Sequence, residues 1–341
     1  MKIFVSGGAG FIGSNFIRLV LSERPEASVV NYDKLTYAGN LDNLRDFEDE
    51  ARYEFIHGDI CDSEFLDSVL KEKKPDAIVN FAAETHVDRS IHLGSREFVM
   101  TNTVGVQTLL DAVRRQEIKK MIQISTDEVY GALQLDEDRK FTESTPFAPN
   151  PPYAAAKAGG DLMARAYYQT FKVPVIVTHC SNNYGPYQFP EKLIPFSIFK
   201  ALADEPVPIY GDGLYVRDWI HVLDHARAIL MILEKGAVGE VYNIGADNER
   251  ANLDVVKMIL RELGKPESLM TEVADRPGHD RRYAIDASKI ERELGWKPTY
   301  TRGRFAEGLR ETIDWYRLNT DWLEKLRSRQ AEINAHLREA K

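Results

Sequence analysis

The first half of the chain alternates short apolar runs with longer amphipathic stretches. The runs have the length of strands, and the stretches repeat apolar residues at helical spacing. In chain order, the expected strands and helices are Ile3–Val5, Phe11–Ser22, Val29–Tyr32, Tyr53–His57, Ser63–Lys71, Ala77–Asn80, Phe98–Arg115, Met121–Ser125, Tyr153–Phe171 and Val175–His179. Strands that alternate with helices indicate βαβ units. The pattern therefore predicts an α/β fold with a doubly wound parallel sheet.

After Cys180 the pattern becomes less regular. It holds turn-forming stretches, one apolar helix and one strand, at Asn182–Pro186, Tyr210–Gly213, His225–Glu234 and Val241–Ile244. The tail from Phe305 is rich in Glu, Arg, Leu and Ala and is expected to be helical. We expect a smaller substrate-binding domain interleaved with the first, so that residues 1–179 plus about 218–248 form one domain and residues 180–217 plus 249–341 form the other.

Composition narrows the class of protein. A chain of 341 residues can bury a large core and carry a smaller companion domain. Its net charge of −9 argues against a sequence-independent nucleic-acid binder, which needs a basic face. Cys61 and Cys180 have neither disulfide nor metal-site spacing, so no metal is expected. With no run near the roughly 18 apolar residues of a membrane span and no leader pattern, we expect a cytoplasmic protein without a membrane partner.

Three glycines, Gly7, Gly10 and Gly13, lie between the first expected strand and helix. This spacing is the dinucleotide-binding fingerprint of a Rossmann domain, in which the backbone approaches a pyrophosphate at the helix N-terminus. Asp33 ends the second expected strand, where a carboxylate binds the ribose hydroxyls of NAD and repels the 2′-phosphate of NADP. A glycine turn without a ligand is the less favoured alternative, because the flanking pattern is also present.

Other residues at strand ends are further candidates for NAD contacts. The alternative, that they are ordinary strand-end residues, has about equal weight for each taken alone. The candidates also include helix residues that follow the glycine turn, and the pair Tyr153 and Lys157. The full set is Phe11, Ile12, Lys34, Thr36, Asp59, Ile60, Phe81, Ala82, Ala83, Tyr153 and Lys157.

Tyr153 and Lys157 are four residues apart and share one face of an expected helix. A nearby ammonium stabilises a phenolate and lowers the tyrosine pKa, which produces a base able to take a hydroxyl proton as a hydride leaves. Alone the spacing is common, and a solvated pair would be the simpler interpretation. The place of this pair in an NAD-binding domain favours the catalytic interpretation. Thr126 is then a second hydrogen-bond partner of the reacting oxygen.

Asp127 and Glu128 follow directly at the carboxyl end of a parallel strand, where doubly wound sheets bind ligands. A simple alcohol dehydrogenase does not need them. An adjacent acid and base indicate removal of a proton from carbon and expulsion of water, provided that their environments separate their pKa values. On these residues alone, an acidic loop in water is an equal alternative.

Together these motifs resemble those of the extended short-chain dehydrogenase/reductases, and among them the dTDP-glucose 4,6-dehydratases. The triplet Thr126–Glu128 is the specific part, and the resemblance covers nearly the whole chain, including residues 83–90, 180–195, 208–213, 216–219 and 275–280. It implies that Tyr153, supported by Thr126 and Lys157, takes the proton of the glucose 4-hydroxyl while hydride passes to NAD⁺. Glu128 then removes the C5 proton, Asp127 protonates the departing 6-hydroxyl, and hydride returns to C6.

The resemblance also implies a homodimer through helices 98–115 and 153–171, and a place in deoxysugar formation such as that of rhamnose. It implies nucleotide-sugar contacts from His86, Thr126, Asn182, Lys192, Leu193, Pro208, Tyr210, Arg217, Asn252, Arg276, His279 and Tyr283. Arg217 and Arg276 suit a diphosphate, because guanidinium pairs with phosphate oxygens bidentately. The alternatives are that the two arginines form surface ion pairs and that His86 and His279 are structural histidines.

The sequence departs from the family pattern at four positions, none of them catalytic. His179 stands where the resemblance leads us to expect Arg, and Pro151, Ala154 and Ala156 stand where Ser is usual. Alternative functions are a 4-epimerase, a UDP-glucuronate decarboxylase, a 4,6-dehydratase for UDP- or CDP-sugars, and a catalytically silent NAD-binding scaffold.

Overall fold

A computed structural model of the chain describes residues 1–333. Its centre is a seven-stranded sheet with the order β10-β6-β5-β4-β1-β2-β3, in which every neighbouring pair is parallel. The strands are β1 (Lys2–Ser6), β2 (Ser28–Asp33), β3 (Tyr53–His57), β4 (Ala77–Asn80), β5 (Lys120–Thr126), β6 (Val175–Cys180) and β10 (Val241–Ile244). The expected strands are confirmed, with ends shifted by at most one residue.

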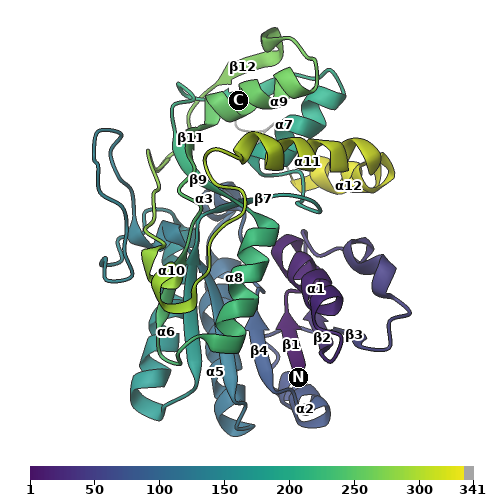
Figure 1. Cartoon of the computed structure of the whole chain (residues 1–341), viewed down its shortest axis with the longest axis vertical. Coiled ribbons are helices and arrows are strands. Elements are labelled where there is room, and N and C mark those ends of the chain that lie inside the picture. The colour runs from purple at the N-terminus through teal and green to yellow at the C-terminus, as the bar shows by residue number, and fades with distance from the viewer. Residues whose placement is uncertain (334–341) are drawn as a thin grey trace.

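Helices cover both faces of this sheet (Figure 1). One face packs against α1 (Phe11–Glu23) and α8 (Val222–Lys235), and the other packs against α2 (Ser63–Lys73), α5 (Val106–Arg115) and α6 (Pro152–Phe171). Buried aliphatic side chains of the strands alternate between these two cores, as the period of a strand requires. The predicted doubly wound α/β fold is therefore confirmed.

The helix expected over Phe98–Arg115 is not continuous. It consists of α4 (Arg96–Val99), a π-helical segment over Met100–Gly105 and α5. At the π-helical segment, Thr103 Oγ1 donates to the carbonyl of Ala156 at 2.8 Å, and a Cβ on Gly160 would lie 2.3 Å from the carbonyl of Asn102. The π-helical segment therefore lies where this helix packs most closely against α6.

The remaining elements form a second layer beyond the carboxyl ends of the parallel strands (Figure 1). They include a sheet of order β11-β9-β7 and a strand pair β12-β8. The strands are β7 (Asn182–Tyr184), β8 (Val207–Tyr210), β9 (Val216–His221), β11 (Glu249–Ala251) and β12 (Met270–Val273). The helices are α7 (Leu193–Leu202), α9 (Asn252–Glu262), α11 (Phe305–Leu318) and α12 (Thr320–Ile333), while α10 (Ser288–Leu294) packs on the main sheet.

Two details of this part differ from the sequence expectation. Helix α8 begins at Val222 rather than His225, because His221 Nδ1 accepts the backbone N–H of Leu223 and so caps the helix. The expected helical tail is two helices that meet at Asn319, and residues 334–341 lie outside the described part. The predicted boundary at residues 217/218 falls inside β9, and the division into domains stays a prediction.

Candidate active site

A cavity of about 400 Å³ lies where the carboxyl ends of the parallel strands meet the second layer. It brings together most of the residues expected from the sequence, although they come from many separate segments. Of the predicted site residues, it is lined by Gly7, Gly10, Phe11, Ile12, Gly13, Phe81, Ala83, His86, Thr126, Asp127, Glu128, Tyr153, Lys157, Asn182, Lys192, Leu193, Pro208, Tyr210, Arg217, Asn252, Arg276 and His279.

The glycine turn forms one wall of this cavity. Gly7 has φ +74°, and a Cβ there would lie 2.4 Å from the backbone nitrogen of Ala82. A Cβ on Gly13 would lie 2.4 Å from the carbonyl oxygen of Gly7, and Gly10 caps α1 without a side chain. The backbone therefore leaves the N–H groups of the first turn of α1 to a ligand. This arrangement fits the pyrophosphate of a dinucleotide.

Asp33 holds the glycine turn to the end of β2. Its carboxylate accepts the N–H of Ala9 at 2.9 Å and the N–H of Leu35 at 2.7 Å. Burial raises the pKa of Asp33, and these two hydrogen bonds oppose that shift. Its position beside the turn is compatible with the predicted contact to the ribose.

Several of the predicted NAD contacts do not line the cavity. Lys34 and Asp59 form an ion pair at 2.8 Å, and Ile60 is buried in the core beside Gly105. Their roles as cofactor contacts stay predictions. The set outside the cavity lining is Asp33, Lys34, Thr36, Asp59, Ile60 and Ala82.

Tyr153 and Lys157 project from α6 into the floor of the cavity. Lys157 is buried, and its Nζ donates to the carbonyl of Ile124 at 2.6 Å. Burial raises the pKa of Tyr153 well above its ordinary value, Glu128 raises it further, and the hydrogen bond with Thr126 lowers it. The predicted lowering of the Tyr153 pKa is therefore wrong in direction, because desolvation and nearby carboxylates dominate around the phenol.

Asp127 and Glu128 begin a 3-10 turn, η3 (Asp127–Tyr130), directly after β5. Thr126 caps the turn, since its Oγ1 accepts the backbone N–H of Glu128 at 3.3 Å. Burial raises the pKa of Asp127 well above its ordinary value, and the charges of Glu128 and Asp218 raise it further. Burial and these charges therefore favour the protonated form of Asp127, which a proton donor to a leaving group requires.

Glu128 has a different electrostatic environment. Burial raises its pKa, but the cations Arg276, Lys192 and Arg217 lower it. These three side chains come from the second layer and face the carboxylate across the cavity. The two adjacent carboxyl groups therefore differ in the charges around them, which is the condition for one to act as an acid and the other as a base.

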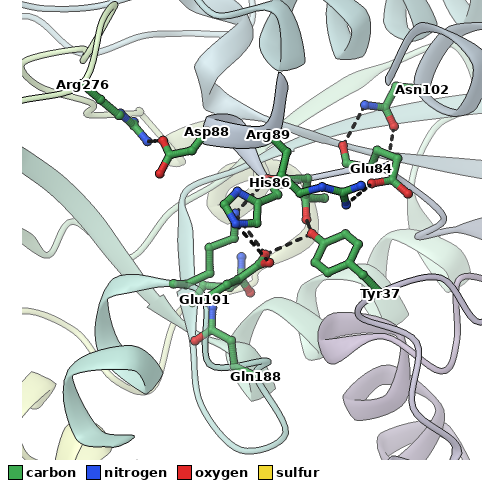
Figure 2. Close-up of polar contacts among 12 residues, drawn as sticks. Tyr37, Glu84, His86, Asp88, Arg89, Asn102, Gln188, Glu191 and Arg276 are labelled. Carbon is green, nitrogen blue, oxygen red and sulfur yellow. Dashed lines mark hydrogen bonds and ion pairs between the residues drawn. The ribbon is translucent and has the colours of Figure 1, made fainter. Parts of the chain in front are cut away.

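The two predicted phosphate-binding arginines have partners within the protein. Arg276 Nη1 lies 3.2 Å from Asp88 Oδ1 on α3 (Val87–His92), as Figure 2 shows. The Arg217 guanidinium is buried and lies over the ring of Tyr283 at 4.2 Å. Tyr283 does not line the cavity, and its hydroxyl donates to Asp280 at 2.5 Å, so its predicted substrate contact stays a prediction.

A polar cluster surrounds His86, which also lines the cavity (Figure 2). Tyr37 donates to Glu191 Oε1 at 3.0 Å, and His86 Nε2 lies 3.9 Å from Glu191 Oε2. Burial raises the pKa of the neighbouring Glu84 to about 7. Sequence reasoning missed Glu191 and Asp88. The only feature of the sequence that could have indicated them is their position: Glu191 directly precedes Lys192, and Asp88 follows His86 by two residues.

The remaining predicted sugar-nucleotide contacts lie on short elements of the second layer. Asn182 begins β7, Lys192 caps α7, Leu193 and Asn252 begin α7 and α9, and Pro208 and Tyr210 lie on β8.

His279 is packed tightly at the same side of the cavity. Its ring stacks on Tyr215 with centroids 3.5 Å apart, and its Nδ1 lies 2.8 Å from Asp275 Oδ1. Burial and the charge of Arg276 lower the pKa of His279 to about 4. The ring is therefore neutral at neutral pH.

Comparison with known proteins agrees with this geometry. The family described as GDP-mannose 4,6 dehydratase matches residues 4–312. A dTDP-glucose 4,6-dehydratase of Xanthomonas campestris pv. campestris (strain B100) is 52% identical over 338 residues, which cover 94% of each chain.

Two solved structures of dTDP-glucose 4,6-dehydratases each align with 96% of this chain and 100% of their own chain. One, from Bacillus anthracis in complex with NAD, is 50% identical with a TM-score of 0.89. The other, from Streptomyces venezuelae with NAD and a dTDP ligand, is 47% identical with a TM-score of 0.91. By sequence and structure, this chain belongs to the dTDP-glucose 4,6-dehydratase family.

Proposed function

We propose that this chain converts dTDP-glucose into dTDP-4-keto-6-deoxy-glucose and water. The observation that carries the proposal is the pairing of Asp127 and Glu128 in one cavity with Thr126 and Tyr153. An oxidoreductase that only exchanges hydride has no use for the two carboxyl groups. A buried acid beside a base supplies the chemistry of an elimination.

NAD fits beside the glycine turn, and when bound it supplies the oxidised nicotinamide that accepts hydride from C4 and later returns it to C6. Tyr153 takes the proton of the 4-hydroxyl, and Thr126 holds the same oxygen by a hydrogen bond. Burial lowers the pKa of Lys157 and the charge of Asp161 raises it; in its charged form Lys157 favours the phenolate that this step needs. Asp33 selects NAD over NADP by repelling a 2′-phosphate.

The 4-ketone acidifies the proton on C5, which Glu128 removes. As the C5–C6 double bond forms, the 6-hydroxyl leaves with the proton of Asp127, and one water is released. Hydride then adds to C6 and a proton returns to C5, so the product has the oxidation state of the substrate less one water. The raised pKa of Asp127 and the cations around Glu128 support this division of roles.

The diphosphate of the substrate binds to Arg217 and Arg276 in this proposal. Both guanidinium groups line the cavity, and both suit phosphate oxygens. The ion pair of Arg276 with Asp88 holds the arginine in place before the substrate arrives. His86, Asn182, Lys192 and the residues on β8 contact the sugar and the nucleoside.

A panel of nucleotide sugars tests the proposed function. We expect dTDP-glucose to give a 4-keto-6-deoxy product, identified by mass spectrometry and NMR, while UDP-, CDP- and GDP-glucose react at least tenfold more slowly, because the site loses contacts made to the thymine base. Conversion of dTDP-glucose to dTDP-galactose would show an epimerase instead. Equal rates with UDP-glucose would refute selectivity for dTDP.

We further propose a homodimer built on α4, the π-helical segment and α6. Val99, Met100 and Leu162 are 44%, 41% and 56% exposed on these elements. Large apolar side chains on adjacent helices are typical of an interface. Sedimentation velocity is expected to give about twice the 38.8 kDa of the chain. A species of single-chain mass at micromolar concentration would contradict the dimer.

We propose that the enzyme acts in the cytoplasm, in the formation of a deoxysugar such as rhamnose. A 4-keto-6-deoxy sugar nucleotide suits further epimerisation and reduction. Within the part of the chain that the structure describes, no helix is both long and apolar enough to cross a membrane. Cell fractionation and sugar analysis of a strain lacking the gene test these two proposals, which fail if the protein sediments with membranes or the deoxysugar content is unchanged.

A further inference from the structure

Tyr37 belongs to the loop over residues 34–40, which follows β2 and which we call the cofactor loop. The loop lies against the glycine turn, because the N–H of Asn40 at its far end donates to the carbonyl of Ala9 at 3.0 Å. Ala38, the residue after Tyr37, lines the cavity. The cofactor loop therefore borders the part of the cavity in which the glycine turn lies.

The hydroxyl of Tyr37 joins this loop to two other segments. It donates to Glu191 Oε1 at 3.0 Å, as Figure 2 shows, and it lies 3.0 Å from Thr85 Oγ1. Thr85 lies in the loop between β4 and α3, whereas Glu191 lies in the second layer just before α7. One phenol therefore connects the cofactor loop both to the loop after β4 and to the second layer.

The ring of Tyr37 has contacts of its own that do not involve the hydroxyl. The guanidinium carbon of Arg89 lies 5.1 Å from the ring centroid, and the ring of Phe189 meets it edge-on with centroids 6.0 Å apart. Phenylalanine at this position keeps both kinds of contact. The hydroxyl can therefore be removed while the packing of the ring is retained.

Glu191 extends the connection to a cation near the proposed catalytic base. Its side chain is 4% exposed, and its Oε1 lies 3.5 Å from Nζ of Lys192. Lys192 Nζ also donates to the carbonyl of Thr85 at 2.8 Å, which closes a ring of polar contacts that begins and ends at Tyr37. Lys192 lines the cavity, and its charge lowers the pKa of Glu128. The contacts of Tyr37 thus reach from the cofactor loop to the residues proposed to bind the sugar nucleotide.

We infer that Tyr37 is a positioning residue that couples the two ligands of the site, so that a bound sugar nucleotide slows the release of NAD. In this scheme NAD leaves when the cofactor loop opens, and opening breaks the hydrogen bonds of the Tyr37 hydroxyl. A ligand bound against Lys192 holds Glu191 in place and so disfavours opening. The inference rests on the proposed function, in which hydride taken from C4 returns to C6 of the same sugar. Loss of the cofactor between these two steps would end the turnover.

The rate of NAD release tests the inference without relying on turnover. Holoenzyme loaded with ¹⁴C-labelled NAD is mixed with excess unlabelled NAD, with and without dTDP, and the label that stays bound is followed over time. In the wild type we expect dTDP to slow release by about fivefold or more. In Tyr37→Phe we expect release without dTDP to be about tenfold faster, because hydrogen bonds of the closed loop are lost. We expect dTDP to slow release from this variant by less than about twofold.

Tyr300→Phe is the matched control. The hydroxyl of Tyr300, between α10 and α11, also donates to a glutamate, Glu311 Oε2, at 2.6 Å, and Tyr300 does not line the cavity. We expect this variant to release NAD at the wild-type rate, with and without dTDP. Equal acceleration in both variants would indicate a general loosening of the fold and would refute the inference.

Three further outcomes overturn the coupling. Unchanged release from Tyr37→Phe would show that the hydroxyl does not hold the loop. Faster release with an undiminished effect of dTDP would show that the two ligands are coupled by another route. Calorimetry separates the last case from failure of the proposed function: dTDP that binds the wild type without slowing NAD release refutes the inference alone, whereas absence of dTDP binding refutes the proposed substrate together with the coupling.

Discussion

Glu128→Gln is expected to oxidise the sugar without dehydrating it, with turnover about 10²–10⁴-fold below the wild type. Glutamine keeps the shape of the side chain but cannot take the proton from C5. Oxidation at C4 depends on Tyr153 and Thr126, which the substitution leaves intact. Because no C5–C6 double bond forms, hydride is not returned to C6, and we expect NADH to accumulate in a single turnover.

Three measurements check this result: NADH absorbance after mixing with dTDP-glucose, exchange of the C5 hydrogen with deuterated water, and product formation. We expect the first signal to rise and the other two to be lost. Glu64→Gln makes the same chemical change at an exposed position in the first turn of α2 and serves as the control. Undiminished exchange at C5 in Glu128→Gln would show that another group is the base.

The main sheet was predictable from the sequence because its strands, apart from the partly exposed edge strand β3, are buried on both faces. Such strands read as continuous apolar runs between helical patterns, and β3, β4 and β10 have the predicted bounds. The second layer was not predictable in the same way. Its strands β7 and β11 have three residues each, too few for a period-two pattern, and α7 is apolar on most sides, which hides its helical repeat.

The candidate site likewise has residues that the sequence predicts and residues that it does not. Gly7–Gly13 and the pair Tyr153 and Lys157 were found because local spacing carries their chemistry. The ion pair of Arg276 with Asp88 joins residues 188 positions apart, and no local pattern reports it.

The electrostatics of the phenol could not be read from the sequence. The spacing of Tyr153 and Lys157 suggests a lowered tyrosine pKa, but the shift depends on how deeply α6 is buried and on which carboxylates face it. In the folded protein burial and Glu128 raise the pKa of Tyr153. The same holds for His179, whose ring lies within hydrogen-bond distance of Asp161 and Tyr130, residues 18 and 49 positions away that no local pattern connects to it.

Tyr153→Phe is expected to stop the reaction before oxidation, with kcat lower by about 10²–10⁴-fold and without NADH accumulation. The substitution removes the group that takes the proton of the 4-hydroxyl in the proposed mechanism, while Lys157 stays buried with its Nζ donating to the carbonyl of Ile124. The ring keeps its packing against Val87 and Phe98, and the lost hydrogen bond with Thr126 is worth about 1 kcal/mol of folding free energy. Thermal unfolding is therefore expected to change little while turnover is lost.

Tyr167→Phe is the matched control for this variant. It lies on the same helix and loses a hydroxyl that donates to Asp111 Oδ1 at 2.8 Å, outside the cavity. We expect similar stability in the two variants and loss of turnover in Tyr153→Phe alone. In a single turnover Glu128→Gln should form NADH, and Tyr153→Phe should not, because the two substitutions block successive steps. NADH formation at the wild-type rate in Tyr153→Phe would show that the C4 proton leaves by another route, and would remove the phenol from the mechanism.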